Sequence, residues 1–341
     1  MAEGVVTIHD VAREAGVSIA TVSRALAGST TVAAATADRV RRAAAALGYE
    51  PNRAARALVT GRGQSVGLVI PDLENPFYSS VAKGMQNRVR AAGLTAIIAD
   101  TDEDVDRERE VLGQLAADVD RMILASPRAA DADLLALAAR SRIVLINRSL
   151  PGVPAVTADN ADGIRQAVGH LLALGHTRIG YAGGPATSWS DAERRAGLTV
   201  AVDAWRAQDR DVTIVDLGAF RPGPAGGVAA ADLAIAEGVT AVLVFNDQLA
   251  LGLLGRLGER GVGVPEAMSV VGFDDVPVAR LLAPALTTVA VPAQRMGAAA
   301  VDLLLAEVPP EGAAARVPEP GPRVVPVELQ VRRSTAQVPR G

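Results

Sequence analysis

The sequence predicts an α/β protein with a small all-helical N-terminal module and a larger two-lobed body built on two parallel sheets. Three observations lead to this prediction. Apolar residues recur at helical spacing from Thr7 to Leu26. From Ser65 onward, short β-branched runs alternate with longer helical patterns, which is typical of a parallel sheet wound by helices. The same alternation restarts at Ile164, so we expect the body to divide into two halves.

The composition is that of a soluble globular protein of about two domains. The chain has 341 residues, of which 49% are hydrophobic and 21% charged. It contains no cysteine, and its histidines (His9, His170 and His176) are isolated, so we expect no disulfide, metal site or cofactor. The N-terminus carries charges where a signal peptide needs an apolar core, and no uncharged apolar run reaches the roughly 18 residues of a membrane span. These features indicate a cytoplasmic protein without a membrane partner.

Charge is divided unevenly along the chain. Residues 1–62 contain eight arginines and five acidic residues, a net charge of +3, which leaves −7 for the rest of a chain whose total is −4. A small basic module on an acidic body suits local contact with phosphate groups without general adhesion to nucleic acid.

The stretch Thr7–Leu26 predicts two short helices joined by a tight turn. Gly16 can take the positive φ that a sharp turn needs, and Ser18 can cap the second helix. The outer face of that helix carries short side chains, hydroxyls and one guanidinium, which can reach base edges and phosphates: Ser18, Ile19, Ala20, Thr21 and Arg24. An ordinary helical hairpin with solvated polar residues is the alternative.

Two further helical segments follow this hairpin. A third helix is expected from about Ala34 to Gly48, with Val40, Ala44 and Leu47 closing a three-helix core. Residues 51–58 could form only about two helical turns with almost nothing to bury them against, so we expect them to order only on a partner. A plain interdomain linker is the alternative, because the sequence that follows is rich in glycine.

These segments carry a family resemblance. The run T-I-H-D-V-A-R-E-A-G-V-S-I-A-T-V-S-R-A-L-A-G at Thr7–Gly28, followed by L-G-Y-E-P-N-R-A-A-R-A-L at Leu47–Leu58, resembles the DNA-binding headpiece of LacI/GalR-type bacterial transcription regulators. The resemblance implies that residues 51–58 are a hinge helix whose leucine wedges into the minor groove. It implies DNA contacts from Thr7, Ser18, Ile19, Ala20, Thr21, Ser23, Arg24, Asn52, Arg53, Ala55 and Leu58.

In the body, strands and helices are expected to alternate. In the first half, strands are expected at 66–70, 95–99, 121–124 and 143–146, and helices at 78–92, 106–117 and 132–140. In the second half, helices are expected at 164–174, 191–208, 226–237 and 248–259, and strands at 178–182, 213–216, 241–245 and 269–273. Because ligands of such sheets bind at the carboxyl ends of the strands, a cleft between the lobes is the expected site.

The resemblance continues through the body. Segments V-G-L-V-I-P-D-L-E-N-P-F-Y, L-G-H-T-R-I-G-Y-A-G-G, F-N-D-Q-L-A-L-G and S-V-V-G-F-D-D, which begin at Val66, Leu174, Phe245 and Ser269, resemble the family's effector domain, which is similar to type I periplasmic sugar-binding proteins. Residues 284–292 and 331–336 match its final crossover and closing strand, whereas 308–326 and 337–341 look variable and loose.

The domain boundaries follow from these segments. We expect a headpiece at residues 1–50, a hinge and linker at 51–63, and an effector-binding and dimerisation domain at 64–341. Within that domain, lobe one is expected at about 64–162 plus 292–325, and lobe two at about 163–291 plus 326–336.

Polar and aromatic residues follow several of the expected strands. By resemblance, the effector pocket is lined by Asp72, Asn75, Phe77, Tyr78, Ser126, Asn147, Arg194, Phe220, Asn246 and Asp274, with Trp189 as a further aromatic candidate. Carboxylates and guanidinium groups can each bind neighbouring hydroxyls, and an aromatic ring packs on the apolar face of a sugar, so the set fits a polyol.

Some of these positions have structural alternatives. Asn75 could serve only in a turn, Asp274 could cap a strand end, and Arg195 competes with its neighbour Arg194 for the pocket. We interpret His176 and Arg178 as structural and Asp247 as a cap on the following helix. Asn147 stands where many relatives have aspartate, and Val291 where sugar binders often have glutamine, which leaves the specific ligand open.

These features predict a regulator and not an enzyme. The sequence has no dinucleotide-binding glycine motif and no P-loop, and no histidine lies in a nucleophile motif. We expect a repressor of carbohydrate-metabolism genes that binds a near-palindromic, double-stranded operator as a homodimer and responds to a small-molecule effector, a sugar in the favoured interpretation. A corepressor-type regulator with an effector such as a purine, or a solute-binding protein without DNA function, is the alternative. The lack of a C-terminal leucine heptad favours a dimer over a tetramer.

Overall fold

The computed structural model describes residues 6–26, 31–49, 65–208, 211–306 and 321–338. The chain separates into two compact units, Met1–Gln64 and Ser65–Gly341. The expected hinge helix, with Asn52, Arg53, Ala55 and Leu58, lies outside the described residues. Within the described ranges, no helix combines the length and apolar character needed to cross a membrane.

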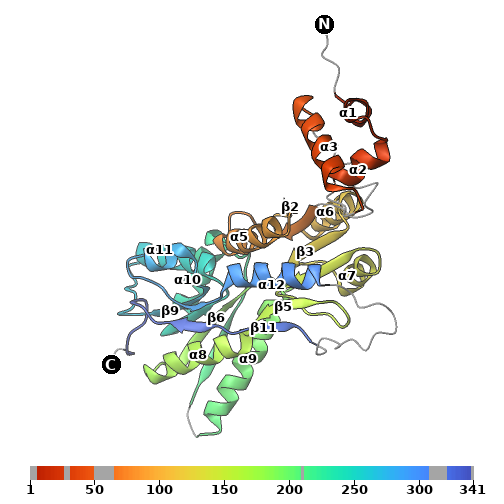
Figure 1. Cartoon of the computed structure of the whole chain (residues 1–341). Coiled ribbons are helices and arrows are strands. Elements are labelled where there is room, and N and C mark those ends of the chain that lie inside the picture. The colour runs from red at the N-terminus through yellow and green to blue at the C-terminus, as the bar shows by residue number, and fades with distance from the viewer. Residues whose placement is uncertain (1–5, 27–30, 50–64, 209–210, 307–320, 339–341) are drawn as a thin grey trace. The chain divides into compact units, whose positions relative to one another are not determined.

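The N-terminal unit is a helical bundle of α1 (Ile8–Ala15), α2 (Ile19–Leu26) and α3 (Ala34–Ala46) (Figure 1). At the start of α1, Asp10 Oδ2 accepts hydrogen bonds from the backbone N–H (2.9 Å) and the hydroxyl (2.7 Å) of Thr7. Gly16 ends α1 with a φ of +63°, as the sequence predicts. Small and β-branched side chains fill the core and allow close helix packing: Val11, Ala12, Ala15, Val22, Ala25, Ala37, Val40, Ala43 and Ala44.

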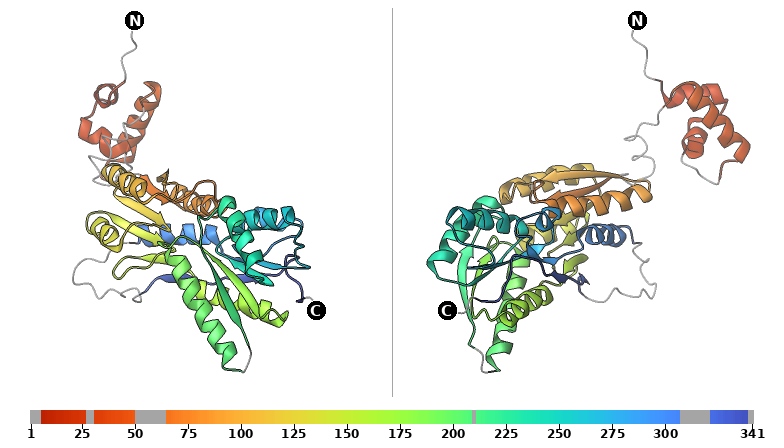
Figure 2. Two further views of the ribbon diagram at one scale, coloured as in Figure 1. Left: turned by 180° about the vertical axis from the view of Figure 1, so that it is seen from behind. Right: turned by 90° about the vertical axis from the view of Figure 1, so that its left-hand side faces the viewer.

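The second unit is built on two sheets, each with six strands in the part of the chain that the structure describes (Figures 1 and 2). The sheet of lobe one has the order β11-β5-β4-β3-β1-β2, and every neighbouring pair is parallel. Its strands are β1 (Ser65–Ile70), β2 (Thr95–Asp100), β3 (Arg121–Ala125), β4 (Arg142–Ile146), β5 (Ala155–Ala158) and β11 (Arg323–Val325).

The sheet of lobe two repeats this plan. Its order is β12-β10-β9-β8-β6-β7, parallel throughout except for the antiparallel edge strand β12. Its strands are β6 (Arg178–Gly183), β7 (Thr213–Ala219), β8 (Ala241–Val244), β9 (Ser269–Asp274), β10 (Thr287–Ala290) and β12 (Glu328–Gln330). The predicted α/β class with two doubly wound parallel sheets is therefore confirmed.

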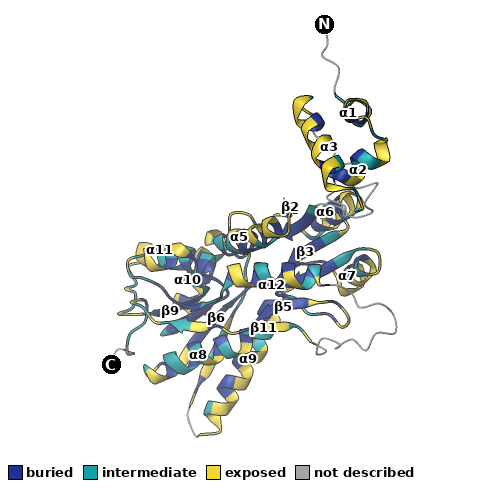
Figure 3. Ribbon diagram, viewed as in Figure 1, coloured by how far each residue is buried: buried dark blue, intermediate teal, exposed yellow. Residues whose placement is uncertain are grey.

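Helices cover the sheets, with buried faces against the strands and exposed faces outward (Figure 3). Lobe one carries α5 (Pro76–Ala91), α6 (Val105–Asp118), α7 (Asp131–Ala138) and α12 (Ala293–Leu305). Lobe two carries α8 (Asn160–Ala173), α9 (Trp189–Arg206), α10 (Pro224–Ala236), α11 (Asp247–Glu259) and the 3₁₀ helix η1 (Pro277–Arg280). The chain passes between the lobes after β5, after β10 and after β11, so each lobe combines segments that are far apart in sequence.

Two expectations about the C-terminal region are wrong. The closing strand is β12, not residues 331–336, and β11 forms inside a stretch that was expected to be loose. Residues 331–336 are held instead through Ser334, whose hydroxyl donates to the carbonyl of Val270 (2.6 Å) and accepts from the N–H of Thr287 (2.8 Å). Single backbone hydrogen bonds, from the N–H of Val270 to the carbonyl of Ser334 (2.8 Å) and from the N–H of Arg333 to the carbonyl of Ala285 (3.0 Å), also hold the segment, which lies against the sheet without regular strand pairing.

Candidate functional site

The outer face of α2 exposes most of the side chains that were expected to contact DNA. Val22 and Ala25 are buried in the bundle, whereas Ile19 at the start of the helix is 41% exposed. Ser18, Ala20 and Arg24 are also exposed, and Thr21 and Ser23 are partly exposed. Ser18 has a second role, because its Oγ accepts the N–H of Thr21 (3.2 Å) and caps the helix. The helix thus presents one guanidinium among short side chains, the types of group that read base edges in the major groove.

In the second unit, a cleft between the lobes is lined by residues near the carboxyl ends of strands. Lobe one contributes Asn75, Phe77, Tyr78, Ser126, Arg128 and Asn147, and lobe two contributes Ser188, Ser190, Arg194, Phe245, Asn246 and Asp274. The enclosed volume is about 20 Å³, room for about one water molecule. The lobes are therefore closed on each other, and a ligand could enter only after they separate.

Contacts between the lobes hold this closed arrangement. Arg221 Nη2 donates to Asp102 Oδ1 at 2.6 Å. Gln248 Nε2 donates to the carbonyl of Glu74 at 3.3 Å. Ser190 Oγ, inside the cleft, lies 3.4 Å from the carbonyl oxygen of Asn147. Only polar contacts of modest strength join the lobes at these points, which is compatible with opening.

Several cleft residues adopt a left-handed backbone where a strand ends. φ is +48° at Ser126 after β3, +53° at Asn147 after β4 and +112° at Asp274, the last residue of β9. Among the described residues, every non-glycine residue with positive φ follows or ends β2, β3, β4 or β9: Asp102, Glu103, Ser126, Asn147, Asp274 and Asp275. Such a conformation costs on the order of 1 kcal/mol or more per residue, and strain of this kind clusters at ligand sites.

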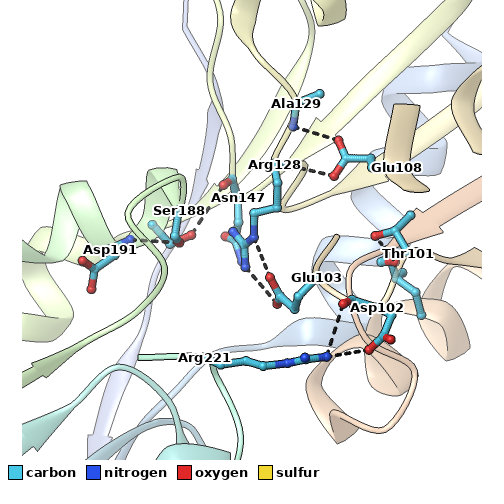
Figure 4. Close-up of polar contacts among 12 residues, drawn as sticks. Thr101, Asp102, Glu103, Glu108, Arg128, Ala129, Asn147, Ser188, Asp191 and Arg221 are labelled. Carbon is cyan, nitrogen blue, oxygen red and sulfur yellow. Dashed lines mark hydrogen bonds and ion pairs between the residues drawn. The ribbon is translucent and has the colours of Figure 1, made fainter. Parts of the chain in front are cut away.

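The wall of lobe one contains Arg128, which two carboxylates hold in place (Figure 4). Its Nε and Nη2 donate to Glu103 at 2.8 and 3.0 Å, and the two side chains are 2% and 9% exposed. Glu108 accepts the backbone N–H groups of Arg128 (2.8 Å) and Ala129 (3.0 Å). Burial raises the pKa of Glu108. Burial opposes the charge of Arg128, but Tyr78 and Glu103 outweigh it and raise the pKa of the guanidinium.

The wall of lobe two contains Arg194, which is 3% exposed. Its Nε donates to Asn160 Oδ1 at 2.9 Å, and Nη1 donates to the carbonyl of Phe245. Its guanidinium carbon lies 3.5 Å from the centroid of the Phe273 ring, within cation–π range. Arg195 instead pairs with Asp191 (2.7 Å) away from the cavity. Of the two arginines, Arg194 is therefore the one that lines the cleft.

Asp274 is the acidic group among the lining residues. Burial raises its pKa to about 7, against the opposing effect of Arg194. Near neutral pH this carboxyl is therefore partly protonated and can donate as well as accept a hydrogen bond.

The expectation that Asp247 caps α11 is wrong. Asn246, whose backbone is extended, caps the helix, and its Oδ1 accepts the N–H of Leu249 at 2.8 Å. Asp247 is the first helical residue and is fully buried. It accepts hydrogen bonds from the hydroxyl of Thr288 (2.6 Å) and the N–H of Val276 (2.9 Å), so it ties α11 to the sheet.

The structure brings eight of the eleven predicted effector residues to the cavity and places three elsewhere. Asp72 binds the N–H of Glu74 (2.8 Å) outside it. Trp189 begins α9, and the serines on either side of it face the cavity instead. Phe220 lines a separate hollow of about 360 Å³ together with Glu103 and Arg221.

Four lining residues were not predicted: Arg128, Ser188, Ser190 and Phe245. Phe245 closes the run 241–245 that was predicted as a strand, and Arg128 lies two residues beyond a predicted strand-end residue, so both carried a positional signal. His176 is structural as expected, because its ring nitrogens contact the hydroxyls of Thr240 and Ser269, each at 3.0 Å.

A helix-turn-helix unit with an exposed second helix, in one chain with a two-lobed body that closes around a polar cleft, defines a ligand-responsive DNA-binding regulator. Residues 7–52 match the profile described as bacterial regulatory proteins, lacI family, and residues 168–335 match that of a periplasmic binding protein-like domain. The HTH-type transcriptional regulator GalR of Escherichia coli K12 is 37% identical over 309 residues, 88% of each chain.

Solved structures agree with these matches. The lac repressor dimer bound to operator and the anti-inducer ONPF has a TM-score of 0.82 at 29% identity, covering 98% of this chain and 100% of that one. A complex of the transcriptional regulator CelR with cellobiose has a TM-score of 0.67 at 30% identity, covering 96% and 99%. This chain belongs to the LacI family and is a DNA-binding transcriptional regulator.

Proposed function

We propose that this protein represses carbohydrate-metabolism genes by binding a near-palindromic operator as a homodimer, and that a sugar-class effector in the interlobe cleft controls this binding. The observation that carries the proposal is the exposed face of α2, which offers Arg24 and short side chains while Val22 and Ala25 anchor the helix in its bundle. The lac repressor, which is similar over almost the whole chain, is a dimer on its operator.

The proposed mechanism uses both units. Two chains place their α2 helices in successive major grooves, and residues 51–58 bind the minor groove between them, where Leu58 bends the duplex. An effector that binds the closed and open lobes with different affinity shifts the equilibrium between states of high and low operator affinity. The protein acts through binding, without catalysis, in the cytoplasm where DNA is accessible.

The polar character of the cleft supports a hydroxyl-rich effector. Asn75, Asn246 and Asp274 offer amide and carboxyl groups to hydroxyls, and Phe77 and Phe245 offer aromatic faces. A regulator similar to this chain has been solved with cellobiose, a disaccharide. The resemblance and the cleft together favour sugars as the first ligands to test.

The DNA proposal is tested by selecting binding sites for the full-length protein from random double-stranded DNA. We expect enrichment of two-fold symmetric sites. Arg24→Ala should weaken binding by about 1–3 kcal/mol and relax the preference at one base pair of each half-site. Arg13→Ala, at an exposed position on α1, is the matched control. A selection without a symmetric consensus would contradict operator binding, and equal weakening on all sequences would make Arg24 a phosphate contact.

A further inference from the structure

We propose that the effector carries an anionic oxygen group, a carboxylate or a phosphate ester on a polyol frame, and that Arg128 is a specificity-determining residue that binds this group opposite Arg194. This inference rests on the proposed function, because it takes the interlobe cleft as the effector site.

The charges of the cleft lining favour an anionic ligand. Each lobe contributes one buried guanidinium to the lining. Glu103 balances the charge of Arg128, whereas Asp274, the carboxyl of the lining, is partly uncharged at neutral pH, so the lining as a whole keeps a net positive charge. The hydrogen-bond acceptors of Arg194 are neutral, an amide oxygen and a backbone carbonyl, and its other neighbours are aromatic rings. A buried cation without a full counter-charge is costly, and an anionic ligand group in the cleft would supply that charge.

The hydrogen bonds of Arg128 fix its side chain and leave one of its groups free to bind a ligand. Glu103 binds its Nε and Nη2, and a guanidinium has five N–H donors, so this pair leaves the Nη1 group to other acceptors. Glu108 fixes the backbone of the same loop through two hydrogen bonds. Arg128 is thus held in one orientation at the cleft before any ligand arrives, and little entropy is lost when it binds one.

The amide side chain of Asn147 also favours an anionic ligand. It lies in the same lining, and its Oδ1 accepts the N–H of Ala158 at 3.3 Å. An aspartate could make the same hydrogen bond and tolerates the same left-handed backbone, but it would add a negative charge beside the two arginines. The amide leaves the positive charge of the cleft available to a ligand.

The experiment compares matched ligands on the full-length protein by thermal unfolding and calorimetry at constant ionic strength. The sets are galactose, galacturonate and galactose 6-phosphate; glucose, gluconate and glucose 6-phosphate; and ribose, ribonate and ribose 5-phosphate. We expect an acidic member of at least one set to bind at least tenfold more tightly than its neutral parent, and the two acidic arms separate carboxylates from phosphates. Absence of stabilisation by every acidic member, whether or not a neutral sugar binds, would overturn the proposal.

Two variants test whether Arg128 and Asn147 set the preference for an acidic ligand. Asn147→Asp should weaken the acidic ligand at least tenfold relative to its neutral parent. The double variant Arg128→Met, Glu103→Gln, which removes both charges of the buried pair together, should abolish the preference for the acidic ligand and leave binding of the neutral parent within about twofold. Asn87→Asp adds the same charge at an exposed position on α5 and serves as the matched control. Equal effects on acidic and neutral ligands, or an unchanged preference for the acidic ligand in the double variant, would overturn the role of Arg128. Operator binding is measured separately, so its failure would contradict the proposed function and not the ligand class.

Discussion

The two walls of the cleft hold a buried arginine in different ways. In lobe one, Arg128 is paired with a carboxylate, and both side chains are almost fully buried. In lobe two, Arg194 lies against aromatic rings and donates to neutral oxygens. The first arrangement makes each charge depend on the other, because removal of one leaves the other uncompensated in the interior. In the second arrangement, removal of the arginine leaves two neutral acceptors and Asp274, a carboxyl that can take up a proton, so we expect lobe two to tolerate substitution better.

The largest effect is expected when the pair of lobe one is broken. Arg128→Met should lower the free energy of unfolding by about 3–5 kcal/mol, because Glu103 is left buried without a counter-charge. Chemical denaturation measures this loss, and the double variant Arg128→Met, Glu103→Gln should recover most of it. If Arg128→Met lowered the free energy of unfolding by less than about 1 kcal/mol, or if the double variant were no more stable than the single one, the two walls would not differ in their tolerance of substitution.

A smaller loss is expected in lobe two. Arg194→Met keeps an apolar stem against the ring of Phe273 and leaves two neutral acceptors without a donor, so the free energy of unfolding should fall by about 1–3 kcal/mol. The same denaturation experiment measures it. If this variant lost as much stability as Arg128→Met, a site of aromatic rings and neutral acceptors would tolerate the loss of its arginine no better than a buried ion pair does.

Asp274 should give lobe two a pH dependence. Its pKa in the folded protein is about 7, above the value of about 3.9 in an unfolded chain. Between about pH 4 and pH 7 the folded state therefore binds more protons, so this group lowers the free energy of unfolding as pH rises, by at most about 1.4 kcal/mol per pH unit. Asp274→Asn should remove this part of the slope in denaturation experiments across that range. Parallel curves for the variant and the parent protein would show that Asp274 ionises normally.

The smallest effect is expected at the contact that joins the walls at the surface. Arg221 and Asp102 are both exposed, so Arg221→Gln should destabilise the closed arrangement of the lobes by less than about 1 kcal/mol. Effector binding, measured by calorimetry, should weaken by at most about fivefold. Arg165→Gln, which breaks an exposed ion pair within α8, is the control. A loss above tenfold in the Arg221 variant alone would mean that this side chain contacts the ligand.

Eight of the predicted residues line the cleft, and their common location could be predicted because the sequence marks strand ends. Runs such as 143–146 are apolar and β-branched, and a parallel sheet brings the carboxyl ends of its strands to one edge, so the polar residue that follows each run faces the cleft. Asn147 and Asp274 follow or end such runs. The family resemblance then indicated which of these strand-end residues to assign to the effector pocket.

The remaining features depend on contacts that no local pattern records. The orientation of Arg128 is fixed by Glu103, 25 residues earlier in the chain. The start of α9 directs Ser188 and Ser190 to the cavity in place of Trp189, and a shift of one residue in a helix turns a side chain by about 100°. Strands β11 and β12 have three residues each, too few for a period to be recognised, and they exist because distant strands offer them an edge.

Because the chain crosses between the lobes three times, both sheets receive their last strand only at the end of synthesis. β11 pairs with β5 at the edge of the first sheet, and β12 pairs with β10 at the edge of the second. Translation therefore makes nearly all of both lobes before either sheet can receive its last strand, and these contacts span large loops that form slowly. A nascent chain shorter than about 320 residues would leave β5 and β10 without the strands that cover them, and unpaired strand edges are the kind of surface that chaperones bind and that aggregation exploits.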